Sequence, residues 1–166
     1  MLPLIRPLAA ADVGAVVGLS LRAWAPVHES MAQVLGGVIN AMVYPDWAAQ
    51  QAADVRAVCE DATAAAWIAE SGGRPAGFVA IRIGPDATGE IEMIAVDPPA
   101  QGQGIGTALT QFAMRVMRDS GVRLVTVATG GVPGHAPARR TYEKAGFTAL
   151  PLVRYYASLG PPPGDF

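Results

Sequence analysis

A glycine-rich turn, "QGQGIG" at residues 101–106, joins an apolar strand-like run to an amphipathic helical pattern. Its three glycines, Gly102, Gly104 and Gly106, lack the Cβ atom that restricts other residues, so the backbone can adopt unusual dihedral angles. The first N–H groups of the helix that follows have no partner inside the helix, and the helix dipole is positive at this end. The turn therefore favours a strand–turn–helix unit that binds an anion such as a diphosphate through its backbone.

Two familiar phosphate-binding motifs do not fit this turn. A dinucleotide-binding fingerprint needs a third glycine where Thr107 stands, after a strand that belongs to a βαβ unit. A Walker loop needs Gly-Lys-Ser or Gly-Lys-Thr, and the turn contains no lysine. A tight turn without any ligand also explains the glycines, so the turn alone leaves both interpretations open.

The surrounding pattern predicts a mixed α/β sheet. Short, turn-rich linkers, "GGRP" and "GPDATG", separate three consecutive strand-like runs and indicate an antiparallel meander. β-branched and aromatic runs predict further strands before and after the meander. The six expected strands lie at residues 4–6, 64–71, 76–84, 89–96, 122–129 and 150–159.

Helical periodicity predicts five helices. We expect Asp12 to cap the first helix, Gly121 to end the fourth, and Gly146 to close the last. Pro137 fits the first turn of the last helix, where its missing N–H costs nothing. The five expected helices lie at residues 13–24, 31–42, 47–61, 104–119 and 137–145.

Composition and charge restrict the class of protein. The chain has 166 residues, the usual size of one domain, and 51% of them are apolar, which allows a sizeable core. No apolar run approaches the roughly 18–20 residues of a membrane span, and the N-terminus lacks a signal-peptide pattern. We therefore expect one cytoplasmic domain over residues 1–159, with no membrane partner, and a flexible tail at residues 160–166.

Several function classes are disfavoured. The net charge of −2 gives no basic footprint for nucleic acid. Cys59 is the only cysteine, which excludes a disulfide within the chain and indicates a small buried apolar residue. The two histidines, His28 and His135, are far apart and lack metal-ligand spacing, so no metal site is expected.

A longer string around the turn resembles the acyl-CoA signature of the GNAT superfamily of N-acetyltransferases. That signature, Gln/Arg-x-x-Gly-x-Gly/Ala, is satisfied by "QGQGIG" and follows a strand that ends in "VDP" at residues 96–98. A second block, "ARRTYEKAGF" at residues 138–147, is similar to the family's C-terminal helix. The resemblance covers residues 64–159 well and residues 1–60 in outline. It implies a GNAT-type fold, a mixed and mostly antiparallel sheet flanked by helices, with splayed strands at the acetyl-CoA site.

The resemblance also implies acetyl-CoA as co-substrate. The pantetheine arm would pair with Ile94, Ala95 and Val96, and the N–H of Val96 would stabilise the oxyanion of the thioester. His135 stands where many members carry an asparagine that binds this arm. Arg139 and Arg140 lie near the expected path of the 3′-phosphate and adenine, or equally face solvent. The pyrophosphate would contact the turn, whose residues are Gln101, Gly102, Gln103, Gly104, Ile105, Gly106 and Thr107.

Candidate catalytic groups follow from the same resemblance. Tyr142 matches the family tyrosine that protonates the leaving thiolate, although a buried core aromatic is the alternative. Glu90 and Glu92 alternate on one strand and are candidate bases or water-positioning groups, with Glu90 at the position where several branches place a catalytic glutamate. Both could equally be solvated or ion-paired. His135 could contact CoA, act as the base or cap the last helix.

We therefore predict an acetyl-CoA-dependent N-acetyltransferase that acts on a primary amine of a small molecule or peptide by direct attack in a ternary complex. There are two alternatives: a non-catalytic acyl-CoA-binding sensor on the same fold, and an enzyme that uses a longer acyl-CoA. A homodimer is compatible with each of these functions. Candidate acceptor-site residues are Trp24, His28, Glu29, Tyr44, Trp47, Tyr155 and Tyr156.

Overall fold

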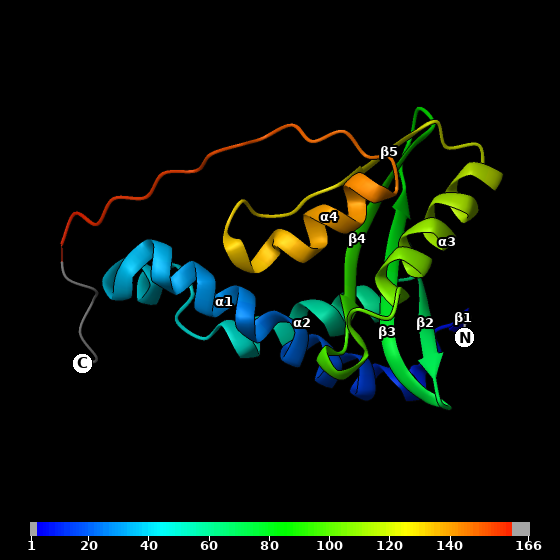
Figure 1. The fold of residues 1–166 in the computed structure, drawn as a ribbon, viewed down its shortest axis with the longest axis horizontal. Coiled ribbons are helices and arrows are strands. Elements are labelled where there is room, and N and C mark those ends of the chain that lie inside the picture. The colour runs from blue at the N-terminus through cyan, green and yellow to red at the C-terminus, as the bar shows by residue number, and fades with distance from the viewer. Residues whose placement is uncertain (1–2, 161–166) are drawn as a thin grey trace.

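The computed structural model describes residues 3–160, which form a five-stranded sheet in the order β1-β2-β3-β4-β5. The first four strands pair antiparallel and β4 pairs with β5 in parallel, so the predicted mixed sheet and its meander are confirmed (Figure 1). The strands are β1 (Leu4–Pro7), β2 (Ala65–Ser71), β3 (Arg74–Ile83), β4 (Thr88–Val96) and β5 (Leu124–Val127).

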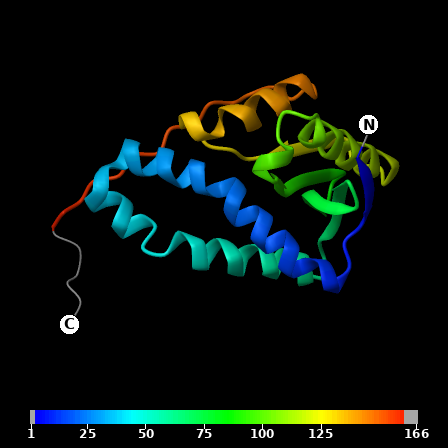
Figure 2. The same cartoon turned by 60° about the horizontal axis from the view of Figure 1, so that its bottom comes forward.

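Helices cover both faces of this sheet. An antiparallel pair, α1 and α2, packs on one face and extends beyond it, whereas α3 packs on the other (Figure 2). The helices are α1 (Val13–Val43), α2 (Trp47–Glu60), α3 (Ile105–Asp119) and α4 (Ala136–Lys144), with 3₁₀ turns η1 (Ala10–Asp12), η2 (Pro98–Ala100) and η3 (Pro133–His135). Among residues 3–160, no helix combines the length and apolar character needed to cross a membrane.

The central strand β3 is buried on both faces. Phe78 and Ala80 pack into a cluster with α1 and α2, whereas Val79 and Ile81 pack into a second cluster with α3. Successive side chains of a strand point to opposite faces, so one apolar run supplies both layers. β3 therefore contributes to both core layers, as do β2 and β4.

The first two expected helices are one helix with a break, which corrects the prediction. The chain stays helical through Pro26 and breaks only at Gly36, where φ is 74° and ψ is 162°. A positive φ costs glycine little, so the break falls there and not between residues 24 and 31.

Asp12 stands at the N-cap position of α1, as predicted, but its side chain makes no capping hydrogen bond to that helix. Its carboxylate accepts the N–H of Ala9 at 2.8 Å and pairs with Arg6 at 2.7 Å. The side chain therefore closes the turn that precedes α1 and ties it to β1, whose Arg6 also pairs with Glu70 of β2.

A β-bulge in β4 opens the sheet. Ala80 pairs with Met93 and Ile81 with Ile91, so Glu92 is an extra residue between two paired positions. β5 pairs only with Thr88–Ile91 of β4. The second half of β4, from Glu92 to Val96, has no neighbouring strand on that side, which is the splay that the resemblance implied.

The last expected strand, residues 150–159, does not form, and the strand expected at 122–129 is shortened to β5. The segment 148–160 is extended but pairs with no strand, and it runs from the end of α4 toward the far end of the α1–α2 pair (Figure 1). A strand exists only against a partner edge, and Pro151 has no N–H to donate. Of the expected tail, residues 161–166 lie outside the described residues.

Candidate active site

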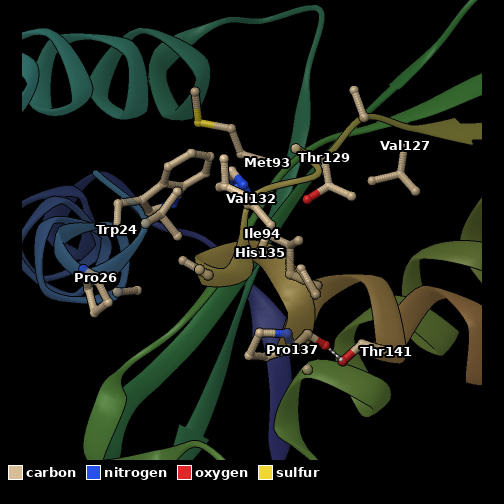
Figure 3. Close-up of a pocket in the computed structure, with 18 of the residues that line it drawn as sticks. Trp24, Pro26, Met93, Ile94, Val127, Thr129, Val132, His135, Pro137 and Thr141 are labelled. Atoms are coloured by element: carbon tan, nitrogen blue, oxygen red, sulfur yellow. Dashed lines mark hydrogen bonds between the residues drawn. The ribbon is translucent and has the colours of Figure 1, made fainter. Parts of the chain in front are cut away.

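A cavity of about 1360 Å³ lies between the α1–α2 pair, the open half of β4, the glycine turn and α4. Figure 3 shows Trp24 of α1, Met93 of β4 and His135 of η3 converging on one part of it. The turn and α4 form one end of the cavity, and α1 with α2 forms the other. Within residues 3–160, no group of three or more His, Cys, Asp or Glu residues is arranged to hold a metal ion.

The open half of β4 presents backbone groups to the cavity. The N–H of Asp97 bonds to Ala76 of β3 at 2.9 Å. The N–H groups of successive residues in a strand point to opposite sides. Because the N–H of Asp97 points toward β3, those of Val96 and Ile94 point away from β3 and toward the gap. The carbonyl of Val96 accepts a hydrogen bond from Gln101 Nε2 at 3.0 Å. Ala95 points its backbone toward β3 and buries its side chain in the core.

The glycine turn has the geometry of an anion cradle. Gly102 and Gly104 have φ of 76° and 81°, and no other atom lies where their Cβ atoms would be. Gly104 precedes α3 and accepts the first helical hydrogen bond, from Ala108 at 2.9 Å. The N–H groups between them, from Ile105 to Thr107, therefore have no partner within the helix. Unpaired donors at the positive end of a 15-residue helix fit a diphosphate.

The residues of the turn that line the cavity are Gln101, Gly102, Gly104, Ile105, Gly106 and Thr107. Gln103 does not line it; its side chain folds back onto the carbonyl of Pro99 at 3.2 Å. Its role in a cradle is therefore limited to its backbone.

The basic residues of α4 divide into two roles. Arg139 donates to the carbonyls of Gly130 and Val132 at 2.6 and 3.0 Å, which holds the loop before η3. It does not line the cavity, whereas Arg140 and Lys144 do. Lys144 was missed by sequence reasoning, although its spacing of four residues from Arg140 places both on one helix face.

Tyr142 is buried on the cavity side of α4. Its ring packs edge-on against Phe147, with centroids 5.9 Å apart. Burial raises the pKa of the Tyr142 phenol to about 12. The hydroxyl therefore keeps its proton at neutral pH, as a proton donor must.

The two candidate carboxylates differ in position. Glu90 is exposed, lies opposite Arg82 and does not line the cavity. Glu92, on the bulge, does line it. Arg82 Nε lies 2.5 Å from Glu92 Oε2, an ion pair that lacks hydrogen-bond geometry, and Arg82 also binds Asp61 at 2.7 Å.

His28 and His135 lie in the same cavity although they are far apart in the sequence. The Nδ1 atom of each is buried without a hydrogen-bond partner. Burial lowers the pKa of both imidazoles, with smaller contributions from His135 on His28 and from Arg139 on His135. Both are therefore uncharged at neutral pH. His135 stands at the N-cap position of α4, but its side chain makes no capping hydrogen bond there.

Most of the candidate acceptor residues meet at the α1–α2 end. Trp24, His28, Tyr44 and Trp47 line the cavity together with Tyr156. Glu29 and Tyr155 are exposed and lie outside the lining. Sequence reasoning did not identify Met93, whose place on the open half of β4 depends on the bulge.

Two long-range contacts hold the walls of the cavity together. Arg22 of α1 binds both carboxylate oxygens of Asp97 at 2.8 Å, which ties α1 to the end of β4. Ser30 of α1 accepts the N–H of Gly134 at 3.0 Å, which ties α1 to η3. The acceptor end and the turn therefore share one rigid frame.

Comparisons with known proteins agree with this architecture. The family model described as "Acetyltransferase (GNAT) family" matches residues 38–147. A mycothiol acetyltransferase of Thermomonospora curvata is 38% identical over 97 residues, 58% of this chain and 31% of that protein. The mycothiol acetyltransferase of Saccharomonospora viridis is 31% identical over 157 residues, 84% of this chain and 49% of that protein. The chain thus spans less than half the length of each of these two relatives.

The fold is also that of solved structures. The PaiA N-acetyltransferase of Thermoplasma acidophilum, in complex with coenzyme A, superposes with a TM-score of 0.68 at 15% identity, covering 90% of this chain and 92% of that one. At this level of identity the likeness concerns the fold.

Proposed function

The chain belongs to the GNAT family of acetyltransferases, and from this we propose that it transfers the acetyl group of acetyl-CoA to a primary amine by direct attack in a ternary complex. The observation that carries the proposal is the cradle of unpaired N–H groups, Ile105 to Thr107, which opens into the same cavity as Tyr142 and the open half of β4. We treat residues 1–159 as one N-acetyltransferase domain, because β3 is shared by both core clusters.

The cofactor-binding part of the proposal uses backbone groups. The turn would hold the pyrophosphate, and Arg140 and Lys144 would face the phosphates from α4. The pantetheine arm would pair with Ile94 and Val96, so Gln101 would release the carbonyl that it now occupies. The N–H of Val96, or that of Ile94, would donate to the thioester oxygen as negative charge develops there.

The chemical step follows from these positions. The amine nitrogen attacks the thioester carbon, a C–N bond forms and the C–S bond breaks. Tyr142 gives its proton to the departing sulfur, and the amine loses its proton to a base. His135 supports that role better than Glu90, because it is uncharged and lines the cavity, and better than Glu92, because it is not ion-paired.

Calorimetric titration with acetyl-CoA and CoA tests the proposal. We expect micromolar binding to the parent protein and none to Gly104→Glu, whose side chain would fill the cradle. Gly14→Glu is the matched control, because Gly14 is exposed, lies on α1 and has no atom near its Cβ position. Parent protein that binds neither ligand would overturn the proposal.

A second measurement separates the enzyme from a sensor. Free thiol released from acetyl-CoA is followed while a panel of primary amines is added. Binding without amine-dependent release would identify an acyl-CoA-binding module without turnover. Tighter binding and faster turnover of longer acyl-CoA would instead identify a different acyl donor.

A further inference from the structure

Five rings from three parts of the chain surround the acceptor end of the cavity. We call them the aromatic box: Trp24, His28, Tyr44, Trp47 and His135, all of which line the cavity. His28 stacks on Trp47, with centroids 4.3 Å apart and planes at 16°, and meets Tyr44 edge-on at 5.2 Å. Trp24 meets His135 edge-on at 5.9 Å and lies 6.4 Å from His28. The contacts run through all five rings without interruption.

The box is held by the backbone. A Cβ atom on Gly134 would lie 2.9 Å from Val27 Cα and 3.1 Å from the carbonyl of Pro26, so η3 packs directly on α1. This contact places His135 beside Trp24. The rings are therefore positioned before any ligand arrives, which lowers the entropy cost of binding.

Charge is distributed unevenly around the cavity. The cations that line it, Arg140, Lys144 and Arg154, come from α4 and the segment 148–160. The lining residues of α1, α2 and β4 include no cation and two carboxylates, Asp54 and Glu92. The two imidazoles of the box are uncharged at neutral pH. The acceptor end therefore offers ring faces and two carboxylates, one of which, Glu92, is paired with Arg82. Arg154, the cation that reaches Tyr44, is already engaged with Tyr156.

Apolar side chains line the acceptor end beside the box, together with Gln50 and Gln51 of α2. Met31, Val34 and Leu35 of α1 line it, as does Met93 of β4. Rings and methionines favour a ligand with a flat or apolar body, and ring faces attract a desolvated ammonium group.

We propose that the aromatic box binds the acceptor, and that this acceptor is a primary amine on an apolar, ring-sized body without a carboxylate or phosphate beside the amine. The inference rests on the proposed function, since it names the substrate class of the same site. Arylalkylamines are the simplest members of this class. The amino acid that carries the same aromatic ring would place its carboxylate against the ring faces of the box and against two other carboxylates, those of Asp54 and Glu92.

Matched pairs of substrates test this class. Tyramine is compared with tyrosine, phenethylamine with phenylalanine and tryptamine with tryptophan, with acetyl-CoA as donor. We expect kcat/KM to be at least about tenfold higher for each amine than for its amino acid. Equal or better use of the amino acids would overturn the inference.

Variants locate the effect in the box. Trp47→Leu and Trp24→Leu should each raise the KM for tyramine about tenfold and leave the Kd for acetyl-CoA unchanged. Phe112→Leu is the matched control, because its ring packs on Trp67 and does not line the cavity. Equal effects of all three variants, or none from Trp24 and Trp47, would contradict the assignment.

A binding measurement keeps the inference separate from the proposed function. In a Trp67→Phe background the remaining tryptophans, Trp24 and Trp47, both belong to the box, so their fluorescence reports amine binding without turnover. Saturable quenching by tyramine and not by tyrosine supports the inference, even if acetyl-CoA does not bind and the proposed function fails. If acetyl-CoA binds and other amines are acetylated, but tyramine causes no quenching, the inference falls and the proposed function stands.

Discussion

At the residue scale, the burial of Tyr142 determines the protonation state of its phenol. A phenol has a proton to give at neutral pH in any environment, but burial raises the pKa of Tyr142 to about 12. Its backbone is equally constrained, because the Tyr142 carbonyl accepts the N–H of Phe147 at 3.0 Å as α4 ends. A buried, protonated hydroxyl that shares a cavity with the glycine turn is suited to protonate a thiolate.

We predict that Tyr142→Phe lowers kcat about 10²–10³-fold, because a positioned general acid contributes on this order. The Kd for acetyl-CoA should change little, since the ring remains. Thiol release and calorimetry measure the two effects, with Tyr155→Phe as a control, because Tyr155 is exposed and outside the cavity. Unchanged kcat in Tyr142→Phe would remove Tyr142 from the mechanism.

The two box histidines make stability depend on pH. Their pKa values lie below 6.5 in the folded chain, so the unfolded chain binds more protons below about pH 6.5. Stability should therefore fall as pH drops from 7.5 to 5. In the double variant His28→Gln, His135→Gln, the decrease in Tm between pH 7.5 and 5 should be smaller than in the parent protein, by on the order of 2–4 °C. Thermal unfolding at both pH values measures this, and parallel falls would contradict it.

At the scale of elements, the docking of η3 on α1 decides where the acceptor end lies. The contact depends on a missing side chain, because a Cβ on Gly134 would lie 3.0 Å from Ser30 Cβ as well as against the backbone of α1. Neither the backbone of η3 nor that of α1 can move away from the other without breaking the hydrogen bond from the Gly134 N–H to Ser30 Oγ. This element contact is therefore sensitive to one methyl group.

We predict that Gly134→Ala displaces η3 and raises the KM for the amine, while the Kd for acetyl-CoA stays within about twofold, because the turn is formed elsewhere. Overpacking should also cost about 1–3 kcal/mol of stability. Gly131→Ala is the control, since its Cβ would meet no atom. Equal effects of both variants on the amine KM would show that the docking contact is unimportant.

At the scale of the whole molecule, the segment 148–160 is the least integrated part of the described chain. Five of its large apolar side chains are between 75% and 100% exposed: Leu150, Leu152, Val153, Tyr155 and Leu159. Contiguous apolar surface of this kind favours association, and β5 is a free edge of the sheet. The homodimer that the sequence left open would use this surface.

We predict that the 166-residue chain self-associates with rising concentration and that a chain ending at Thr148 does not. Sedimentation velocity over a range of concentrations measures the change. The shortened chain should keep its Tm within a few degrees, because the five side chains named above bury little surface. A 166-residue chain that remains monomeric at high concentration would contradict the prediction.

Features with local causes were predictable from the sequence. Positive φ at Gly102 and Gly104 follows from the absence of a Cβ atom, and the start of α3 follows directly from that turn. The meander followed from short turn-rich linkers, and α4 from Pro137 and Gly146 at its ends. In each case the residues that cause the feature lie within a few positions of it.

Tertiary structure alone decided what depends on partners distant in sequence. The segment 150–159 has the composition of a strand but found no edge in the described chain, and no local property reveals that. The bulge at Glu92 arises from the register between β3 and β4. His28 and His135 share a cavity because Gly134 packs on α1. Pairing, register and packing are set by the whole chain, so the conformation of the glycine turn could be predicted from sequence, whereas the arrangement of the aromatic box could not.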